Sequence, residues 1–165
     1  MSDTLNETAP TPEPCIVNLT EQMLDDVIKI ETNSYINPWS KQNFKDAIDA
    51  GDVGYFCVAL QDAPQGKLMG YMIALEGVDE VHLLNITVAP DAQRKGCART
   101  LLETLRLWTR ARKKEWLWLE VRQSNTRAQY IYEQFGFTMV GTRRNYYPIA
   151  PGVKEDAILM SLPVC

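Results

Sequence analysis

The sequence contains few of the residues that build metal sites and disulfide frameworks. Its 165 residues include one histidine, and the four cysteines show no CxxC pair. The cysteines are Cys15, Cys57, Cys97 and Cys165. Structural zinc sites need about four Cys or His ligands at short spacings, and disulfide-stabilised folds show regular cysteine spacing. The sequence therefore predicts no metal site and no disulfide framework, and it favours a reducing compartment.

Long apolar runs and an excess of basic charge are also missing. No stretch is long and apolar enough to span a bilayer, and the N-terminus lacks the basic start and apolar run of a signal peptide. The formal net charge of -4 does not favour a surface that binds nucleic acid. We therefore expect a cytoplasmic protein with neither a membrane nor a nucleic acid as its partner.

The composition is typical of one folded domain with a tail in front of it. The chain is 45% hydrophobic and 23% charged, and its length suffices for one hydrophobic core. Residues 1–14 are acidic and proline-rich and carry almost nothing to bury, so a flexible tail is predicted there. Residues 15–165 are predicted to form the domain.

Apolar residues recur in strand and helix patterns along this domain. Strands are expected at residues 15–19, 54–60, 67–75, 81–90, 115–121, 137–142 and 155–162, the last two joined by a loop around residues 143–152. Helices are expected after a Thr20 cap, from Ser40 to about residue 50, after residue 99, and from Ser124 or Asn125 to a Gly136 cap. The strand–helix–strand order of residues 81–121 implies a parallel pair. The predicted fold class is α/β, with a mixed sheet of six or seven strands and about four helices.

A short glycine-containing loop lies between a predicted strand and a predicted helix, at residues 93–98 (QRKGCA). The free N–H groups and positive dipole end of a helix N-terminus can hold a pyrophosphate. Gly96 and the small Ala98 would let the backbone approach a phosphate closely. Three basic side chains add positive charge: Arg94, Lys95 and Arg99. An ordinary surface turn is the alternative, and the spacing matches neither the P-loop nor the GxGxxG motif.

In its wider context this loop resembles the acetyl-CoA-binding motif of the Gcn5-related N-acetyltransferases (GNAT superfamily). Gln93, Gly96 and Ala98 stand at the fixed places of the motif Q/R-x-x-G-x-G/A. The segment WLEVRQSNTRAQYIYEQFGF is similar to the next strand and helix of that family. RRNYYP and EDAILM resemble the RimI-type branch, which acetylates the N-terminal alanine of a ribosomal protein. The resemblance covers roughly residues 37–162.

The resemblance implies where acetyl-CoA binds. Backbone groups of Ile86, Thr87 and Val88 would pair with the pantetheine arm as if it were another strand. The amides of the loop would hold the pyrophosphate, at Arg94, Lys95, Gly96, Cys97, Ala98 and Arg99. Beyond that point the two parallel strands would splay and leave a cleft for the thioester and the amine.

Glu120 stands out in the predicted strand at residues 115–121. Alternation places it on one face with Trp116 and Trp118, although a strand of a parallel pair is usually buried on both faces. An apolar setting would raise its pKa and suit it to proton transfer. The alternative is an ion pair with Arg122 or a loop residue. By resemblance, Glu120 matches the general base of the RimI-type branch.

Tyr132 and Asn125 lie seven residues apart on the predicted helix, and so on the same face. A departing CoA thiolate benefits from a proton donor, which a phenol can supply. On the residues alone, Tyr132 is better explained as an aromatic packed beside Phe135 and Phe137. By resemblance, Tyr132 matches the general acid and Asn125 a residue that contacts CoA.

The remaining polar candidates have weaker support. His82, in a predicted strand, is more often a structural residue than a base, and Glu80 is a second candidate for removing a proton through water. Tyr146 and Tyr147 either line the acceptor groove or pack in a hairpin. A basic run near the end of a helix most simply solvates that helix, with RNA contact as the alternative. Its members are Arg106, Arg110, Arg112, Lys113 and Lys114.

These expectations converge on an acetyl-CoA-dependent N-acetyltransferase that works by direct transfer, without metal. By resemblance, the acceptor is the N-terminal alanine of the eighteenth protein of the small ribosomal subunit. Two alternatives stay open. One is an acetyltransferase for lysine side chains or a small amine, and the other is an acyl-CoA-binding module that does no chemistry.

Overall fold

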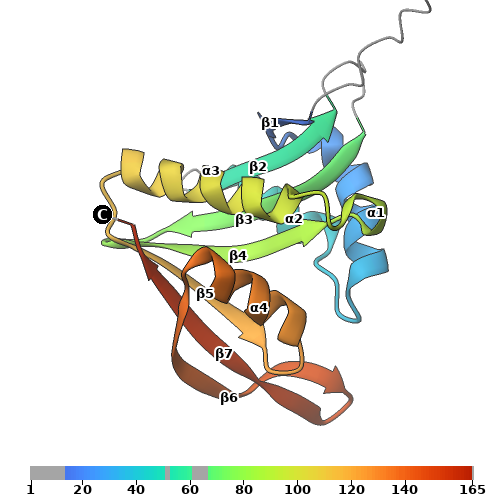
Figure 1. Ribbon diagram of the computed structural model, residues 1–165. Helices are drawn as coiled ribbons and strands as arrows, with labels where there is room; N and C mark the ends of the chain where they lie inside the picture. Colours follow the sequence, from blue (N-terminus) through green and yellow to red (C-terminus); the bar gives the residue numbers. More distant parts are fainter. Residues whose placement is uncertain (1–13, 51–52, 61–66, 165) are drawn as a thin grey trace, which may run out of the picture.

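Apolar runs form strands and amphipathic stretches form helices, largely where the sequence patterns indicate. The computed structural model describes residues 14–50, 53–60 and 67–164 (Figure 1). Within these residues seven strands are found: β1 (Pro14–Asn18), β2 (Val53–Leu60), β3 (Leu68–Glu76), β4 (Glu80–Val88), β5 (Trp116–Arg122), β6 (Thr138–Ala150) and β7 (Val153–Pro163). The α-helices of the same residues are α1 (Leu24–Ser34), α2 (Lys41–Asp49), α3 (Cys97–Ala111) and α4 (Thr126–Phe135). Two 3₁₀ turns, η1 (Glu21–Met23) and η2 (Pro90–Ala92), precede α1 and α3.

All these strands belong to one mixed sheet in the order β1-β2-β3-β4-β5-β7-β6. The neighbours β4 and β5 are parallel, and the other pairs are antiparallel. Helix α3 makes the crossover between β4 and β5 that a parallel pair requires. The predicted fold class and the parallel pair are therefore confirmed.

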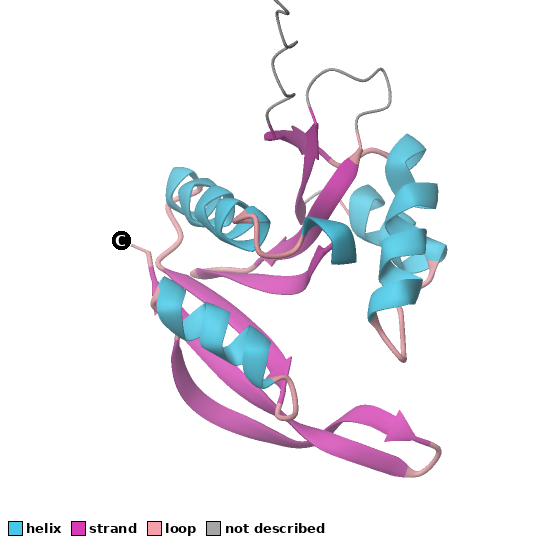
Figure 2. Ribbon diagram, turned by 45° about the vertical axis from the view of Figure 1, so that its right-hand side comes forward, coloured by secondary structure: helices cyan, strands magenta, loops and turns pink. Residues whose placement is uncertain are grey.

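The sheet separates two hydrophobic cores, because successive side chains of a strand point to opposite faces. On β3, Met72 and Ala74 face the core beneath α3 and α4, whereas Tyr71 and Ile73 face the core beneath α1 and α2. All four of these side chains are fully buried. Figure 2 shows the two helix pairs on opposite sides of the sheet.

Several helix boundaries follow the predicted caps. Ser40 caps α2, since its side chain accepts from Asn43 N–H and the Asn43 side chain accepts in return from Ser40 N–H. Gly136 ends α4 in the left-handed conformation, with a φ of 119°. The predicted Thr20 cap is wrong, because Thr20 makes no side-chain cap hydrogen bond and the chain first forms η1.

The predicted loop at residues 143–152 is also wrong in most of its length. Residues 143–150 belong to β6, and the turn is confined to Pro151 and Gly152. Nearly all of β6 is exposed, so no alternation of buried and exposed residues marks it as a strand. Of the predicted tail, residues 1–13 lie outside the described residues, and Pro14 is the first residue of β1.

Candidate active site

The two parallel strands separate part of the way along their length. β4 and β5 pair from Glu80 with Trp116 to Leu83 with Leu119, and no further (Figure 1). Beyond this point β4 stays paired with β3, and β5 stays paired with β7. The register of β3 with β4 shifts just after Leu83. One edge of β4 therefore faces a cleft instead of a strand, as the family resemblance implied.

The first of two connected clefts has a volume of about 580 Å³ and lies between β4, the start of α3 and α4. Its lining includes most of the predicted cofactor-binding residues: Ile86, Thr87, Val88, Arg94, Gly96, Cys97, Ala98, Arg99 and Asn125. Lys95 is not among the residues that line it. Arg127, which the sequence analysis did not single out, does line it.

The loop before α3 has the backbone shape of an anion-binding turn. Gly96 is the N-cap of α3 with a φ of 81°, and Arg94 has a φ of 63°. Among the described residues no side chain caps this helix end, so its first N–H groups are left for a ligand. A methyl group at Gly96 would meet nothing within 4 Å, so glycine is required there by its φ and not by space. Burial raises the pKa of the Cys97 thiol, which favours a structural role for this side chain over that of a nucleophile.

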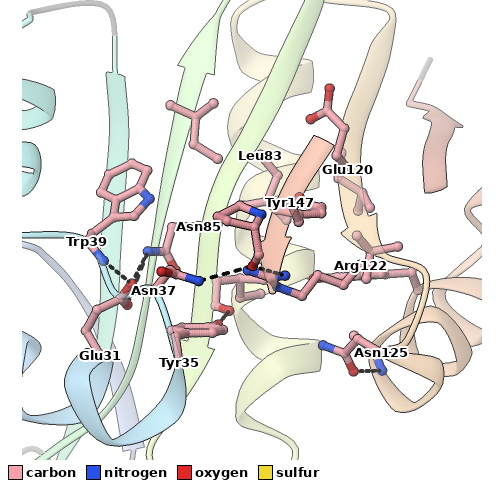
Figure 3. Close-up of a pocket in the computed structure, with 17 residues that line it drawn as sticks. Glu31, Tyr35, Asn37, Trp39, Leu83, Asn85, Glu120, Arg122, Asn125 and Tyr147 are labelled. Atoms are coloured by element: carbon pink, nitrogen blue, oxygen red, sulfur yellow. Dashed lines mark hydrogen bonds between the residues drawn. The ribbon is translucent and has the colours of Figure 1, made fainter. Parts of the chain in front are cut away.

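The second cleft, of about 370 Å³, lies between α1, β4, β5 and β6 (Figure 3). Glu120 and Tyr147 line it, and Glu31 lines the opposite wall. The two clefts share five lining residues: Tyr35, Ile86, Asn125, Ala128 and Tyr132. Two ligands, one in each cleft, would therefore meet beside Tyr132.

Glu120 is the carboxylate that the alternation of β5 singled out, and its side chain is 7% exposed. Its Oε2 lies 2.5 Å from His82 Nε2, and its Oε1 lies 3.3 Å from Arg143 Nε. Burial acts to raise the pKa of Glu120, but His82 and Arg143 together outweigh it and hold that pKa below its usual range. The expected rise in pKa is therefore wrong.

The alternative explanation, that Glu120 forms an ion pair, is correct, but its partner is Arg143 and not Arg122. Arg122 binds Glu155 and the Pro148 carbonyl, each at 3.1 Å. Arg143, which binds Glu120, lies in the segment expected to be a loop. Glu120 is thus an ionised carboxylate with two partners, on the wall of a cleft.

Tyr132 is buried where the two clefts meet. Its ring packs edge-to-face on Phe137, with 5.8 Å between the centroids, as the structural explanation expected. Burial raises the pKa of its hydroxyl well above the usual value, and Tyr35 and Tyr147 add to the effect. Within the described part of the chain, no hydrogen bond to this hydroxyl is found. Asn125, at the start of the same helix, accepts from Ala128 N–H at 3.1 Å, which leaves its amide nitrogen for a ligand.

The other predicted residues separate into those inside and those outside the site. Tyr147 lines the second cleft, with its ring under Arg122, whereas Tyr146 is half-exposed and does not line it. Burial, together with Glu120 and Tyr146, raises the pKa of Tyr147 to about 12. His82 contacts Glu120 directly. Glu80 accepts instead from Asp79 N–H, at the start of β4 and away from the cleft.

The basic run at the end of α3 is mostly paired within the protein. Arg106 binds Glu103, Arg110 binds the Val164 carbonyl, and Arg112 and Lys114 bind Glu76. These contacts support the structural explanation of the run. They give no support to RNA contact.

Sequence reasoning missed Glu31, a carboxylate only 1% exposed. Its Oε1 accepts from Trp39 N–H at 2.9 Å, and its Oε2 accepts from the Tyr71 hydroxyl at 2.5 Å. The Asn85 amide donates to both oxygens, at 3.3 and 3.2 Å. A signal was present, because Glu31 continues the buried stripe of Leu24 and Val27 on α1.

The hydrogen-bond network of Glu31 continues to the free edge of β4. The Thr87 hydroxyl donates to Asn85 Oδ1 at 3.0 Å. The Tyr35 hydroxyl then lies 2.8 Å from Thr87 Oγ1 and 3.1 Å from the Ile86 carbonyl. Glu31 therefore holds together α1, β3 and the part of β4 that lines both clefts.

Neither a metal site nor a membrane span is apparent in the described ranges. No group of three or more metal-ligating side chains is found in residues 14–50, 53–60 and 67–164. No helix in these ranges has the length and apolar character needed to cross a bilayer.

Comparison with known proteins gives consistent matches. The profile of the acetyltransferase (GNAT) family matches residues 24–137. The chain is 42% identical over 135 residues to the ribosomal protein bS18 alanine N-acetyltransferase of Escherichia coli K12, covering 82% of this chain and 87% of that protein. It is 35% identical over 147 residues to the enzyme of that name from Haemophilus ducreyi, covering 89% and 98%.

Solved structures agree with these matches. The crystal structure of the ribosomal-protein-S18-alanine N-acetyltransferase from Escherichia coli superposes with a TM-score of 0.81 at 37% identity, covering 92% of this chain and 94% of that one. Arabidopsis thaliana NAA60 in complex with a bisubstrate analogue also gives a TM-score of 0.81, at 18% identity, which shows a shared fold alone.

Proposed function

We propose, because this chain belongs to the acetyltransferase (GNAT) family, that it acetylates the N-terminal alanine of ribosomal protein bS18 with acetyl-CoA. The observation that carries the proposal is the pair of connected clefts, one at a helix N-terminus and one at an ionised carboxylate. The relatives of that name, at 42% and 35% identity, support this acceptor. A cytoplasmic location, and an acetyltransferase domain of residues 15–165, are part of the same proposal.

Acetyl-CoA fits the first cleft by its shape and by the groups that line it. The uncapped start of α3, the left-handed Gly96 and the nearby Arg99 and Arg127 suit a pyrophosphate. The free edge of β4 at Ile86–Val88 and the amide of Asn125 suit the amide groups of the pantetheine arm. Acetyl-CoA supplies the thioester that is cleaved, and no metal is needed.

In the second cleft, Glu120 takes the proton of the acceptor amine. Only a neutral amine attacks a thioester, and an α-amine has a pKa of about 7.7–8.0, against about 10.4 for lysine. At pH 7 roughly one α-amine in ten is neutral, but only about one lysine in 2,500. A single carboxylate is thus better matched to an N-terminal amine than to a lysine side chain.

Tyr132 donates a proton to the departing thiolate. Its raised pKa keeps the hydroxyl protonated at neutral pH, and this hydroxyl is not engaged by another described residue. It sits where the two clefts join, which is where the acyl group must pass from sulfur to nitrogen.

The acceptor's first residues lie between the α1–α2 connection and the β6–β7 hairpin in this proposal. The two segments touch where the Asn37 side chain donates to the Pro148 carbonyl at 3.1 Å. Tyr147 lines the cleft beside this contact, and Tyr146 stands next to it on the rim. A closed rim of this kind favours a small first side chain such as alanine.

Mass spectrometry of peptides tests the function. Purified protein and acetyl-CoA would be given a free alanine-initiated peptide, the same peptide N-terminally blocked but containing lysine, and peptides with other first residues. We expect one acetyl group on the free alanine peptide and none on the blocked one. Acetylation of the blocked peptide would assign the chain to a lysine acetyltransferase, and binding of acetyl-CoA without acetylation would favour a module that does no chemistry.

A pair of glycine variants tests the cofactor site. Gly96→Ala and Gly152→Ala both place a methyl at a positive φ (81° and 74°) where nothing lies within 4 Å. Each should destabilise the fold by about 1–2 kcal/mol. Only Gly96→Ala should weaken acetyl-CoA binding in calorimetry, because Gly152 lies at the β6–β7 turn. Equal affinities in the two variants would contradict the assigned cofactor site.

A further inference from the structure

His82 contacts Glu120, and the proposed reaction gives this histidine no role. The contact of 2.5 Å between His82 Nε2 and Glu120 Oε2 joins the parallel strands just where their pairing ends. The His82 side chain is 32% exposed, whereas that of Glu120 is 7% exposed. One partner of the pair is thus enclosed beside the acceptor cleft, and the other reaches water.

The geometry defines how protons are shared in this pair. An ionised carboxylate only accepts hydrogen bonds, so the proton between the two groups is carried by Nε2 of the imidazole. A neutral imidazole with a proton on Nε2 has an unprotonated Nδ1. An ionised carboxylate paired with such a ring therefore retains one site on the imidazole, Nδ1, that can accept a proton.

Glu120 alone is a poor final site for the proton of an ammonium group. An α-amine has a pKa of about 7.7–8.0, whereas a free glutamate has one of about 4.3, so transfer to a carboxylate is uphill by roughly 3.5 pKa units. Arg143, at 3.3 Å from Oε1, makes the carboxylate a still weaker base. An ordinary imidazole, with a pKa of about 6.5, reduces the gap to roughly 1.5 units.

We propose that Glu120 and His82 form one base, in which Glu120 receives the acceptor ammonium and the proton comes to rest on His82. The proposal rests on the proposed function. One N–H bond of the ammonium breaks and leaves its electron pair on the nitrogen, and one N–H bond forms at Nδ1 of His82. Glu120 keeps its hydrogen bond from Nε2 and stabilises the imidazolium. Water carries the proton from the ammonium to Nδ1 of His82. Water later removes it from the exposed ring.

The titratable groups around the pair come from β6 and β4, whereas β3, β5 and β7 place uncharged side chains beside it. β6 contributes Arg143, which binds Glu120, and Tyr147, whose pKa responds to Glu120. On β4 the nearest titratable side chain is Glu80, two residues before His82. β5 places Trp118 beside His82, and β3 places Leu75 opposite it, and neither titrates. Because such groups titrate together, the pair is treated as one base.

The first test is the acetylation rate of the alanine-initiated peptide as a function of pH. His82→Gln keeps a donor for Glu120 but removes the proton acceptor, so kcat/KM for the peptide should fall on the order of 10²-fold at pH 7. The loss should shrink towards pH 9, where the α-amine is neutral by itself. The KM for acetyl-CoA should not change, and the matched control Glu80→Gln should stay within about twofold of wild type.

Three results would overturn the proposal. Wild-type kcat/KM in His82→Gln would show that His82 only holds Glu120 in place. A loss of equal size at pH 7 and pH 9, or an equal loss in Glu80→Gln, would indicate a structural defect. If instead the wild-type protein acetylates no peptide, the proposed function itself fails. The second test then decides whether Glu120 and His82 share protons as proposed.

The second test needs no activity. His82 is the only histidine of the sequence, so nitrogen NMR of labelled imidazole reports on this ring alone. We expect the neutral ring to carry its proton on Nε2 and to have Nδ1 unprotonated. A neutral ring protonated on Nδ1 would contradict the proposal.

Discussion

Two buried carboxylates, Glu31 and Glu120, lie on opposite walls of the same cleft and have opposite surroundings (Figure 3). Glu31, on the α1 side, accepts only from neutral donors: a backbone N–H, a tyrosine hydroxyl and an asparagine amide. Glu120, on the β5 side, is held by an imidazole and a guanidinium, both of which can carry charge. The first carboxylate is held by neutral donors of fixed charge, whereas the second contacts a permanently charged guanidinium and an imidazole that can gain or lose a proton.

This difference teaches that burial alone does not identify a reactive acid. Fixed neutral donors around Glu31 hold three segments in register, and its removal should affect stability. His82, a partner that can change its charge, suits Glu120 to the proton transfer proposed for it. The comparison predicts that substitutions on the two walls separate activity from stability.

The largest expected effect is the loss of activity in Glu120→Gln. The amide cannot accept the proton of the acceptor, so kcat should fall on the order of 10²- to 10⁴-fold. Unfolding in urea should change by only about 1 kcal/mol, because the amide fills the same space. Steady-state kinetics on the alanine peptide and chemical denaturation would measure the two quantities. If Glu120→Gln unfolds at a much lower urea concentration but keeps full activity, then Glu120 is the structural carboxylate and not the reactive one.

The next effect is on stability, in Glu31→Gln. The new amide group would face the Asn85 amide and other donors, which leaves buried donors unpaired and should cost about 2–3 kcal/mol in the free energy of unfolding. Asp26→Asn is the matched control, because Asp26 is an exposed carboxylate on the same helix and should matter by less than about 0.5 kcal/mol. Equal stabilities of the two variants would show that the buried network contributes nothing.

A smaller effect is expected when one donor of Glu31 is removed. Tyr71→Phe keeps the ring and its edge contact with Phe44, at 5.7 Å between centroids, but deletes the hydroxyl. The carboxylate retains its bonds from Trp39 and Asn85, so the free energy of unfolding should fall by about 1–2 kcal/mol. Urea denaturation measures this directly. No change at all would mean that the Tyr71 hydroxyl does not stabilise Glu31.

The smallest effect is a dependence of stability on pH that comes from Glu120. Its pKa in the folded protein is lowered below 4.5, so the folded state holds the charged form better than the unfolded state does. The contribution is present above the unfolded pKa and is lost as pH falls through the folded value. Unfolding of wild type and Glu120→Gln between pH 6 and pH 3 should therefore show the wild-type protein losing more stability. Parallel curves would argue against a lowered pKa.

The β5 wall was largely predictable, because its signals are local. The alternation of residues 115–121 placed Glu120 on a distinct face, and the glycine loop before α3 marked the cleft proposed for acetyl-CoA. The expected rise in the pKa of Glu120 failed for a physical reason. His82 and Arg143 come from other strands, and no pattern within one strand shows which charges the folded sheet brings beside it.

The α1 wall was much harder to predict. Asn85, Tyr71 and Trp39 reach Glu31 from positions 8 to 54 residues away, so only the folded chain brings them together. The second half of β6, residues 143–150, was predicted as a loop for another reason. Its exposed residues lack a buried face, and Asn145, with a φ of 50°, and Pro148 are typical of turns.

The separation of β4 from β5 gives the sheet an inner edge in addition to its two outer ones. Open strand edges invite other chains to pair with them, and natural proteins shield such edges against aggregation. The inner edge at Ile86–Val88 lies within the sheet, with β3 on one side and α4 across the cleft on the other. A peptide strand brings side chains on both of its faces at every residue, whereas a pantetheine arm carries its two amides on a chain that is branched only at its pantoyl end. The position of this edge between β3 and α4 therefore suits pairing with such an arm better than pairing with a β-strand of another chain.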